Sequence, residues 1–110
     1  MIPFTGSRFI TSGVENEIPA ELQTVMWNSI DDDIRLQKKV DYLQVFILKY
    51  TYVNGVQIQE IIHKQEQPSR KKRLTVETDN PVSAKVFVID DVTHSTMLMN
   101  HEYYCKMKSY

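Results

Sequence analysis

The residues whose side chains could bind a metal or transfer protons gather near the C-terminal end of the sequence. They are Asp90, Asp91, His94, His101 and Glu102, with His63 in an earlier segment. Carboxylates and imidazoles are common metal ligands, so a metal-dependent enzyme that uses the Asp90–His94 region is one hypothesis. The spacing argues against it, because His101 and Glu102 would lie on opposite faces of a strand and no HxH, HExxH or paired-cysteine motif occurs. We expect aspartates that cap a turn, with no metal site.

Cys105 and His63 are the remaining candidates for nucleophilic or acid–base chemistry. Cys105 follows His101 by four residues, and no nearby group is placed to orient a base or to stabilise an oxyanion. His63 is expected to be a partly buried, hydrogen-bonded histidine, since no partner for a catalytic base can be identified. The sequence therefore predicts no catalytic residue, no cofactor and no enzymatic activity.

A basic run and two tyrosines suggest a different chemistry. The run is Arg70, Lys71, Lys72 and Arg73, and the tyrosines are Tyr50 and Tyr52. Cations that hold phosphates beside rings that stack on bases make nucleic-acid binding an alternative hypothesis. Charge runs next to a sheet edge more often face water and protect that edge. The whole chain has 13 basic and 14 acidic residues, so it lacks the overall basic excess of many nucleic-acid-binding proteins.

One amphipathic helix is predicted to begin at Pro19, which suits the first helical position. Apolar residues recur at helical spacing to form one buried stripe, which consists of Ile18, Leu22, Val25, Met26 and Ile30. The same stripe would include Asp33, and an unpaired buried carboxylate is costly. We therefore expect the regular helix to end or reorient near Asp31–Asp33. Trp27 points away from the stripe, so either the N-terminal strand or the C-terminal tail covers it, or it is a contact anchor for a partner.

The strongest local signal is a hairpin that turns at Asn54-Gly55, a dipeptide that tolerates positive φ at both turn positions. A two-residue loop fixes the register of its strands, Val40–Val53 and Val56–Glu66. The predicted pairs are Val53 with Val56, Thr51 with Ile58, Lys49 with Glu60, Ile47 with Ile62, and Phe46 with His63. The opposite charges of Lys49 and Glu60 support this register.

Further strands complete an α+β fold, in which one amphipathic helix packs on a largely antiparallel sheet of about five strands. Pro68 should interrupt strand pairing after the hairpin. The other predicted strands are Arg8–Val14, Leu74–Glu77 after the basic run, Val82–Asp90 and Ser95–Tyr104, with a helix as the alternative over 95–104. A chain of 110 residues with 42% hydrophobic content is expected to form a single domain over residues 1–110.

Four sequence blocks together resemble a known family. They are Ile18–Gln23 with Trp27, Asp41–Phe46, Ile61–Glu66 with Pro68, and Val86–Asp91 leading to His94–Leu98. In combination they are similar to a family of short cytoplasmic proteins of low-GC Gram-positive bacteria, known only as a domain of unknown function. The resemblance covers nearly the whole chain. It implies no activity, ligand or catalytic residue.

The sequence favours a non-enzymatic protein-binding or adaptor domain with an unidentified protein partner. The expected contact residues are Trp27, Tyr50 and Tyr52, and a homodimer is an alternative. The single cysteine, the absence of a signal-peptide pattern and the short apolar runs predict a cytoplasmic protein without membrane contact.

Overall fold

The computed structural model describes residues 3–107, and side chains through residue 103. This part of the chain is α+β, with six strands and three helices rather than about five strands and one helix. The strands are β1 (Ser7–Ile10), β2 (Leu43–Val53), β3 (Val56–Glu66), β4 (Ser69–Val76), β5 (Ala84–Asp90) and β6 (His94–Met99). The helices are α1 (Ser12–Glu17), α2 (Ala20–Arg35) and α3 (Asn100–Met107). None of the helices in residues 3–107 is long and apolar enough to cross a membrane.

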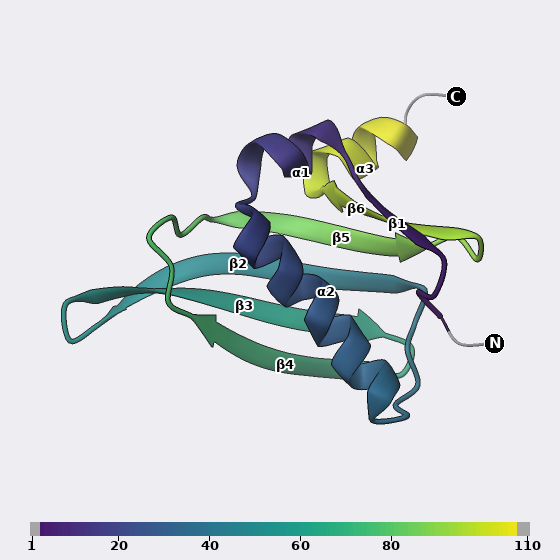
Figure 1. The fold of residues 1–110 in the computed structure, drawn as a ribbon, viewed down its shortest axis with the longest axis horizontal. Helices are drawn as coiled ribbons and strands as arrows, with labels where there is room; N and C mark the ends of the chain where they lie inside the picture. Colours follow the sequence, from purple (N-terminus) through teal and green to yellow (C-terminus); the bar gives the residue numbers. More distant parts are fainter. Residues whose placement is uncertain (1–2, 108–110) are drawn as a thin grey trace.

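All six strands belong to one sheet, in the order β1-β6-β5-β2-β3-β4 (Figure 1). Neighbouring strands are antiparallel except β1 and β6, which run parallel. The prediction of a largely antiparallel sheet is therefore confirmed. The N-terminal strand lies beside the last strand, a pairing that links the two ends of the chain.

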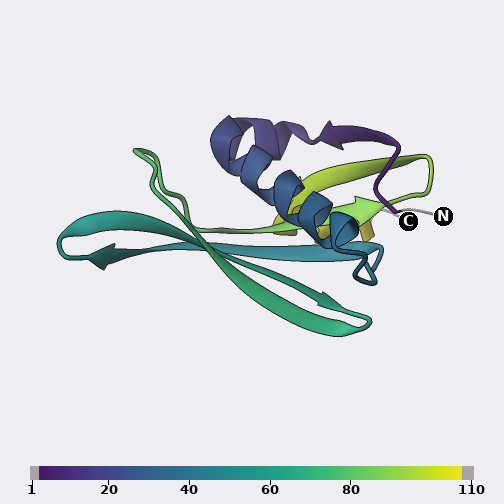
Figure 2. The ribbon, with the colours of Figure 1, turned by 60° about the horizontal axis from the view of Figure 1, so that its bottom comes forward.

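The hairpin of β2 and β3 has the predicted register. Lys49 lies opposite Glu60 and Phe46 opposite His63, as do the three other expected pairs. Asn54 and Gly55 both have positive φ, at 52° and 81°, as the two-residue turn requires. Lys49 Nζ lies 3.3 Å from Glu60 Oε1. The hairpin end projects beyond the rest of the sheet as an arm (Figure 2).

The two ends of the chain differ from the predicted strands. The strand expected over Arg8–Val14 stops at Ile10, because the Thr11 side chain accepts a hydrogen bond from the Val14 amide and starts α1. The segment Ser95–Tyr104 forms neither one strand nor one helix. It continues β6 to Met99 and then becomes α3, so each alternative holds for about half of it.

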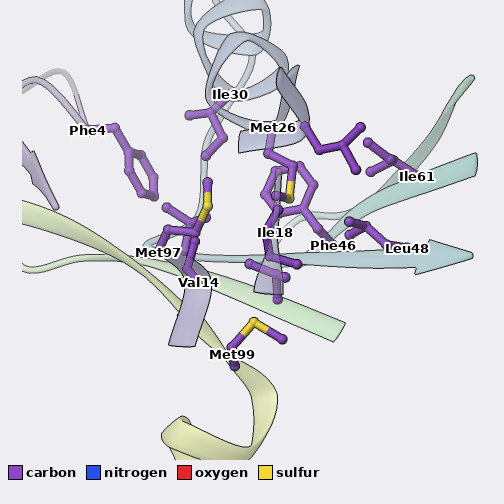
Figure 3. Close-up of a cluster of buried hydrophobic side chains, with 13 residues drawn as sticks. Phe4, Val14, Ile18, Met26, Ile30, Phe46, Leu48, Ile61, Met97 and Met99 are labelled. Atoms are coloured by element: carbon purple, nitrogen blue, oxygen red, sulfur yellow. The ribbon is translucent and has the colours of Figure 1, made fainter. Parts of the chain in front are cut away.

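Helix α2 runs diagonally across one face of the sheet (Figure 1). Its predicted stripe is buried, and Figure 3 shows Met26 and Ile30 beside sheet side chains such as Phe46 and Met97. The helix starts at Ala20, with Pro19 as its N-cap. It continues to Arg35, so the expectation that it would end or reorient near Asp31–Asp33 was wrong.

The two faces of the sheet are covered unequally. We call the face under α2 the helix face and the other the open face. On the open face, Val45, Phe87 and Leu98 form a second, smaller apolar cluster. The Tyr103 ring of α3 packs edge-on against Phe87, with ring centroids 4.9 Å apart. Among the α3 side chains that the structure describes, Tyr103 packs on this cluster, which includes Val45 of β2, whereas Ile62 of β3 lies outside it.

Candidate functional site

His63 is the centre of a polar network buried between α2 and the sheet. Its Nε2 lies 2.6 Å from Gln44 Oε1, and its Nδ1 lies 2.6 Å from Ser29 Oγ. Gln44 Nε2 donates to the Asp41 carbonyl, which leaves Oε1 as the acceptor toward His63. The ring therefore carries its proton on Nε2, and the Ser29 hydroxyl donates to Nδ1.

The surroundings of His63 keep its ring neutral. Burial is the main factor that lowers the pKa of His63 from 6.5 to about 4, and the charges of Lys72 and Arg70 lower it further, while Asp33 acts to raise it. The ring also stacks on Phe46, with centroids 4.3 Å apart. A neutral ring suits this position, because both nitrogens already have hydrogen-bond partners.

Asp33 is buried in the same region, and its partners explain why the helix does not end there. Lys72 Nζ lies 2.9 Å from Asp33 Oδ1 and also donates to the Ser29 carbonyl at 3.0 Å. Arg70 Nη2 lies 3.7 Å from the other carboxylate oxygen. A buried carboxylate that is paired in this way does not carry the penalty of an unpaired one. The prediction failed because these cations come from β4, far away in the sequence.

The Ser29–His63 pair has the geometry of a nucleophile and its base, but it is closed to substrates. Ser29 and His63 are each only 3% exposed. The adjoining cavity has a volume of about 10 Å³, which corresponds to about one water molecule. A base must reach the proton that it removes, and the space beside His63 is too small to admit a substrate.

Three of the candidate residues near the C-terminus, Asp91, His94 and Glu102, border an open hollow of about 370 Å³, whereas the exposed His101 does not line it. His94 Nε2 lies 3.9 Å from Asp91 Oδ2, whereas Asp90 instead accepts a hydrogen bond from the Phe4 amide. Within the part of the chain that the structure describes, no group of three or more His, Cys, Asp or Glu residues could hold a metal ion. The side chain of Cys105 lies outside the described residues.

Glu102 also borders this hollow, but its carboxylate is already engaged. It accepts hydrogen bonds from the Thr11 hydroxyl at 2.6 Å and the Met99 amide at 2.8 Å. Burial acts to raise the pKa of Glu102, but these bonds, together with one from the Gly13 amide, hold it below its ordinary value. The hydrogen bonds of Glu102 therefore connect the N-terminus of α1 to the N-terminus of α3.

The three aromatic residues proposed as partner contacts lie in two different places. Trp27 is half-buried against the core, and the guanidinium of Arg8 from β1 lies 4.8 Å from its ring. This arrangement matches the alternative in which the N-terminal strand covers Trp27. Tyr50 and Tyr52 lie on the projecting arm and are 46% and 68% exposed, so they remain free for contact.

The basic run Arg70–Arg73 is divided between the two faces of the sheet. Because side chains alternate along a strand, Arg70 and Lys72 point toward α2 and pair with Asp33. Lys71 and Arg73 point to the open face, where Arg73 Nε lies 3.6 Å from Glu60. Among the described residues, Lys71 is thus the one member of the run that faces outward without an ion pair.

The strand pairing gathers further cations around an aliphatic seam on the open face. Ile47 lies opposite Ile62, and this pair is flanked by Lys85 of β5 and Arg73 of β4. The neighbouring row places Val45 opposite Lys64, which lies opposite Lys71. We call the set Val45, Ile47, Ile62, Lys64, Lys71, Arg73 and Lys85 the basic seam.

Sequence reasoning missed several members of these sites. Lys64 and Lys85 lie outside the basic run, and only the pairing of β3 with β4 and of β2 with β5 brings them beside Lys71 and Ile47. The position of Lys64 beside Lys71 could have been predicted from the two-residue connection Gln67-Pro68, because this connection fixes the register of β3 and β4. No sequence pattern indicated that Ser29 would bind His63, because the two residues are distant in the sequence.

Comparisons with known proteins relate the chain to bacterial proteins of unknown function. A family model described as "Staphylococcal protein of unknown function (DUF960)" matches residues 7–102. A crystal structure of a protein of unknown function from Enterococcus faecalis has a similar fold, with a TM-score of 0.66 and 23% sequence identity. The similarity covers 88% of this chain and 90% of that one. No curated protein matches.

Proposed function

We propose that this chain, which belongs to the family of staphylococcal proteins of unknown function, is a non-enzymatic protein-binding domain that contacts its partner through the basic seam. The observation that carries this proposal is the unequal covering of the sheet. Helix α2 covers the helix face, whereas on the open face Tyr103, among the described side chains of α3, packs on the cluster of Val45, Phe87 and Leu98 and not on β3 or β4. Ile47 and Ile62 remain partly exposed at the middle of the sheet.

The polar groups of the described residues favour binding over catalysis. His63 and Ser29 are sealed from solvent, and Glu102 is occupied by the hydrogen bonds that join α1 and α3. By contrast, the basic seam combines an apolar centre with a charged rim, which is the usual arrangement of a protein interface.

Site-specific photo-crosslinking tests the proposal. A photoreactive phenylalanine analogue replaces Ile62 in the basic seam, and a matched variant carries it at Thr24, an exposed position of α2. In a staphylococcal lysate we expect crosslinked products of defined mass from position 62 and none from position 24. Identical products from both positions, or none from position 62, would contradict the proposal.

Nucleic-acid binding is a second candidate, which the outward-facing Lys71 and Arg73 support together with Lys64 and Lys85. It predicts an affinity for a single-stranded oligonucleotide that falls steeply with salt. The exposed rings of Tyr50 and Tyr52 lie on the opposite face of β2 from Ile47, away from these cations, and Phe87 is only 5% exposed beneath Tyr103. Protein binding is therefore the better-supported function.

A further inference from the structure

Two lysines of the basic seam lie directly opposite one another. Lys64 of β3 pairs with Lys71 of β4, and both side chains are exposed. Glu66 lies on the same face of β3 and borders the same hollow as both lysines, but among residues 3–103 neither lysine forms an ion pair with a carboxylate. Like charges opposite one another destabilise a sheet. Places where a sequence breaks such a local rule are often functional, and an anion from outside would reduce the repulsion between the two lysines.

The spacing of the seam matches a particular shape of ligand. Lys85 of β5 and Arg73 of β4 lie on either side of the Ile47–Ile62 pair, three strand spacings apart. At about 4.8 Å per spacing this separation is roughly 14 Å. An α-helix with its side chains is about 10–12 Å across. A helix that lies along β2 and β3 therefore fits between the two cations, with the aliphatic pair beneath it.

We infer that the basic seam docks an acidic amphipathic helix of a partner protein. The apolar stripe of this helix covers Ile47 and Ile62. Carboxylates on its flanks face Lys85 on one side and the unpaired Lys64 and Lys71 on the other, beside Arg73, which is already paired with Glu60. This inference rests on the proposed protein-binding function and adds the chemistry of the partner. The bound helix would complete a three-layer arrangement, opposite α2.

A second copy of the chain fits the seam less well. Helix α2 carries the exposed acids Glu21 and Asp32, but its apolar stripe is buried in its own core. A folded copy thus cannot present α2 as an amphipathic ligand. A nucleic acid would neutralise the lysines, but it would leave the aliphatic pair without an apolar partner. The acidic helix satisfies both parts of the surface.

Fluorescence anisotropy with a designed probe tests the inference. The probe is a labelled peptide of about 18 residues, with leucines at helical spacing and glutamates elsewhere, roughly 27 Å long as a helix. Its controls are a peptide with lysine in place of glutamate, a scrambled peptide of equal composition, and a single-stranded oligonucleotide. We expect the acidic helical peptide to bind best, with an affinity that weakens as salt is added.

Lys71→Glu separates a binding role from a structural one. This variant places a carboxylate opposite Lys64, so its thermal midpoint should rise while its affinity for the acidic peptide falls about tenfold or more. Arg35→Glu, an equal charge change at an exposed position on α2, should leave the affinity within about twofold, since the site lies on the other face.

The inference would be overturned by equal binding of the scrambled peptide, by tighter binding of the oligonucleotide, or by unchanged affinity in Lys71→Glu. Failure of the acidic peptide to bind would also overturn it. If crosslinking from position 62 still captures a partner in that case, the proposed function stands and only the partner's chemistry is wrong. If neither experiment detects binding, both proposals fail.

Discussion

Acidification should destabilise the protein through His63 in particular. The pKa of the folded protein's ring lies at about 4, below the ordinary value of 6.5 expected in the unfolded chain. Between these values the unfolded chain binds a proton that the folded protein does not. The contribution of His63 to stability is therefore fully present above pH 6.5 and is lost as the pH falls toward 4.

The structure also sets the size of this effect. One pKa unit corresponds to about 1.4 kcal/mol, so the interval from 6.5 to about 4 gives a loss of about 3 kcal/mol at its lower end. The physical origin is the dry environment of the ring, which is stacked on Phe46 and lies near the charge of Lys72. Such a loss is a substantial part of the ~5–15 kcal/mol that stabilises a typical domain.

Urea unfolding of the wild type and His63→Gln at several pH values between 7 and 4 measures this contribution. Glutamine keeps a polar group beside Ser29 and Gln44 but does not titrate in this range. His94 and His101 are present in both proteins, as are all the carboxylates, so the difference between the two pH profiles isolates His63. The free energy of unfolding should fall about 3 kcal/mol more in the wild type than in His63→Gln. Parallel profiles would refute the reasoning.

Two further predictions concern buried charges and helix caps. Asp33→Ala leaves Lys72 without its nearest carboxylate and should lower the free energy of unfolding by about 3 kcal/mol. Asp32→Ala, at the adjacent exposed position, should change the free energy of unfolding by less than about 0.5 kcal/mol. Equal losses for the two variants in urea unfolding would contradict this prediction. A Cβ at Gly13 would lie 2.7 Å from the Glu102 carboxylate, so Gly13→Ala should destabilise the wild type by about 1 kcal/mol through loss of the caps. In a Glu102→Ala background the same change should instead stabilise the helix by up to about 1 kcal/mol, and a double-mutant cycle that shows no coupling would contradict the assignment.

The parts of the fold that the sequence predicted correctly depend on local rules. A two-residue Asn54-Gly55 turn leaves one register for its strands, so the pairing of Phe46 with His63 followed from the turn alone. The buried stripe of α2 followed from helical periodicity. The break between β3 and β4 followed from Pro68, which lies in their connection.

The parts that were mispredicted depend on partners distant in the sequence. Asp33 was expected to stop the helix because its cations on β4 could not be foreseen. The parallel pairing of β1 with β6 joins opposite ends of the chain, and no local pattern encodes it. The basic run was read as one patch, whereas strand alternation divides it and the sheet brings Lys64 and Lys85 to its outer half.

Isoleucine methyl spectra recorded during titration with the acidic helical peptide test the central claim, that this protein binds through the open face of its sheet. Ile61 and Ile62 are adjacent in β3 but lie on opposite faces, and Ile30 of α2 is buried with Ile61. We predict that the methyl signals of Ile47 and Ile62 shift, while those of Ile30 and Ile61 stay unchanged. Shifts confined to Ile30 and Ile61, or no shifts at a peptide concentration that saturates the anisotropy signal, would contradict the claim.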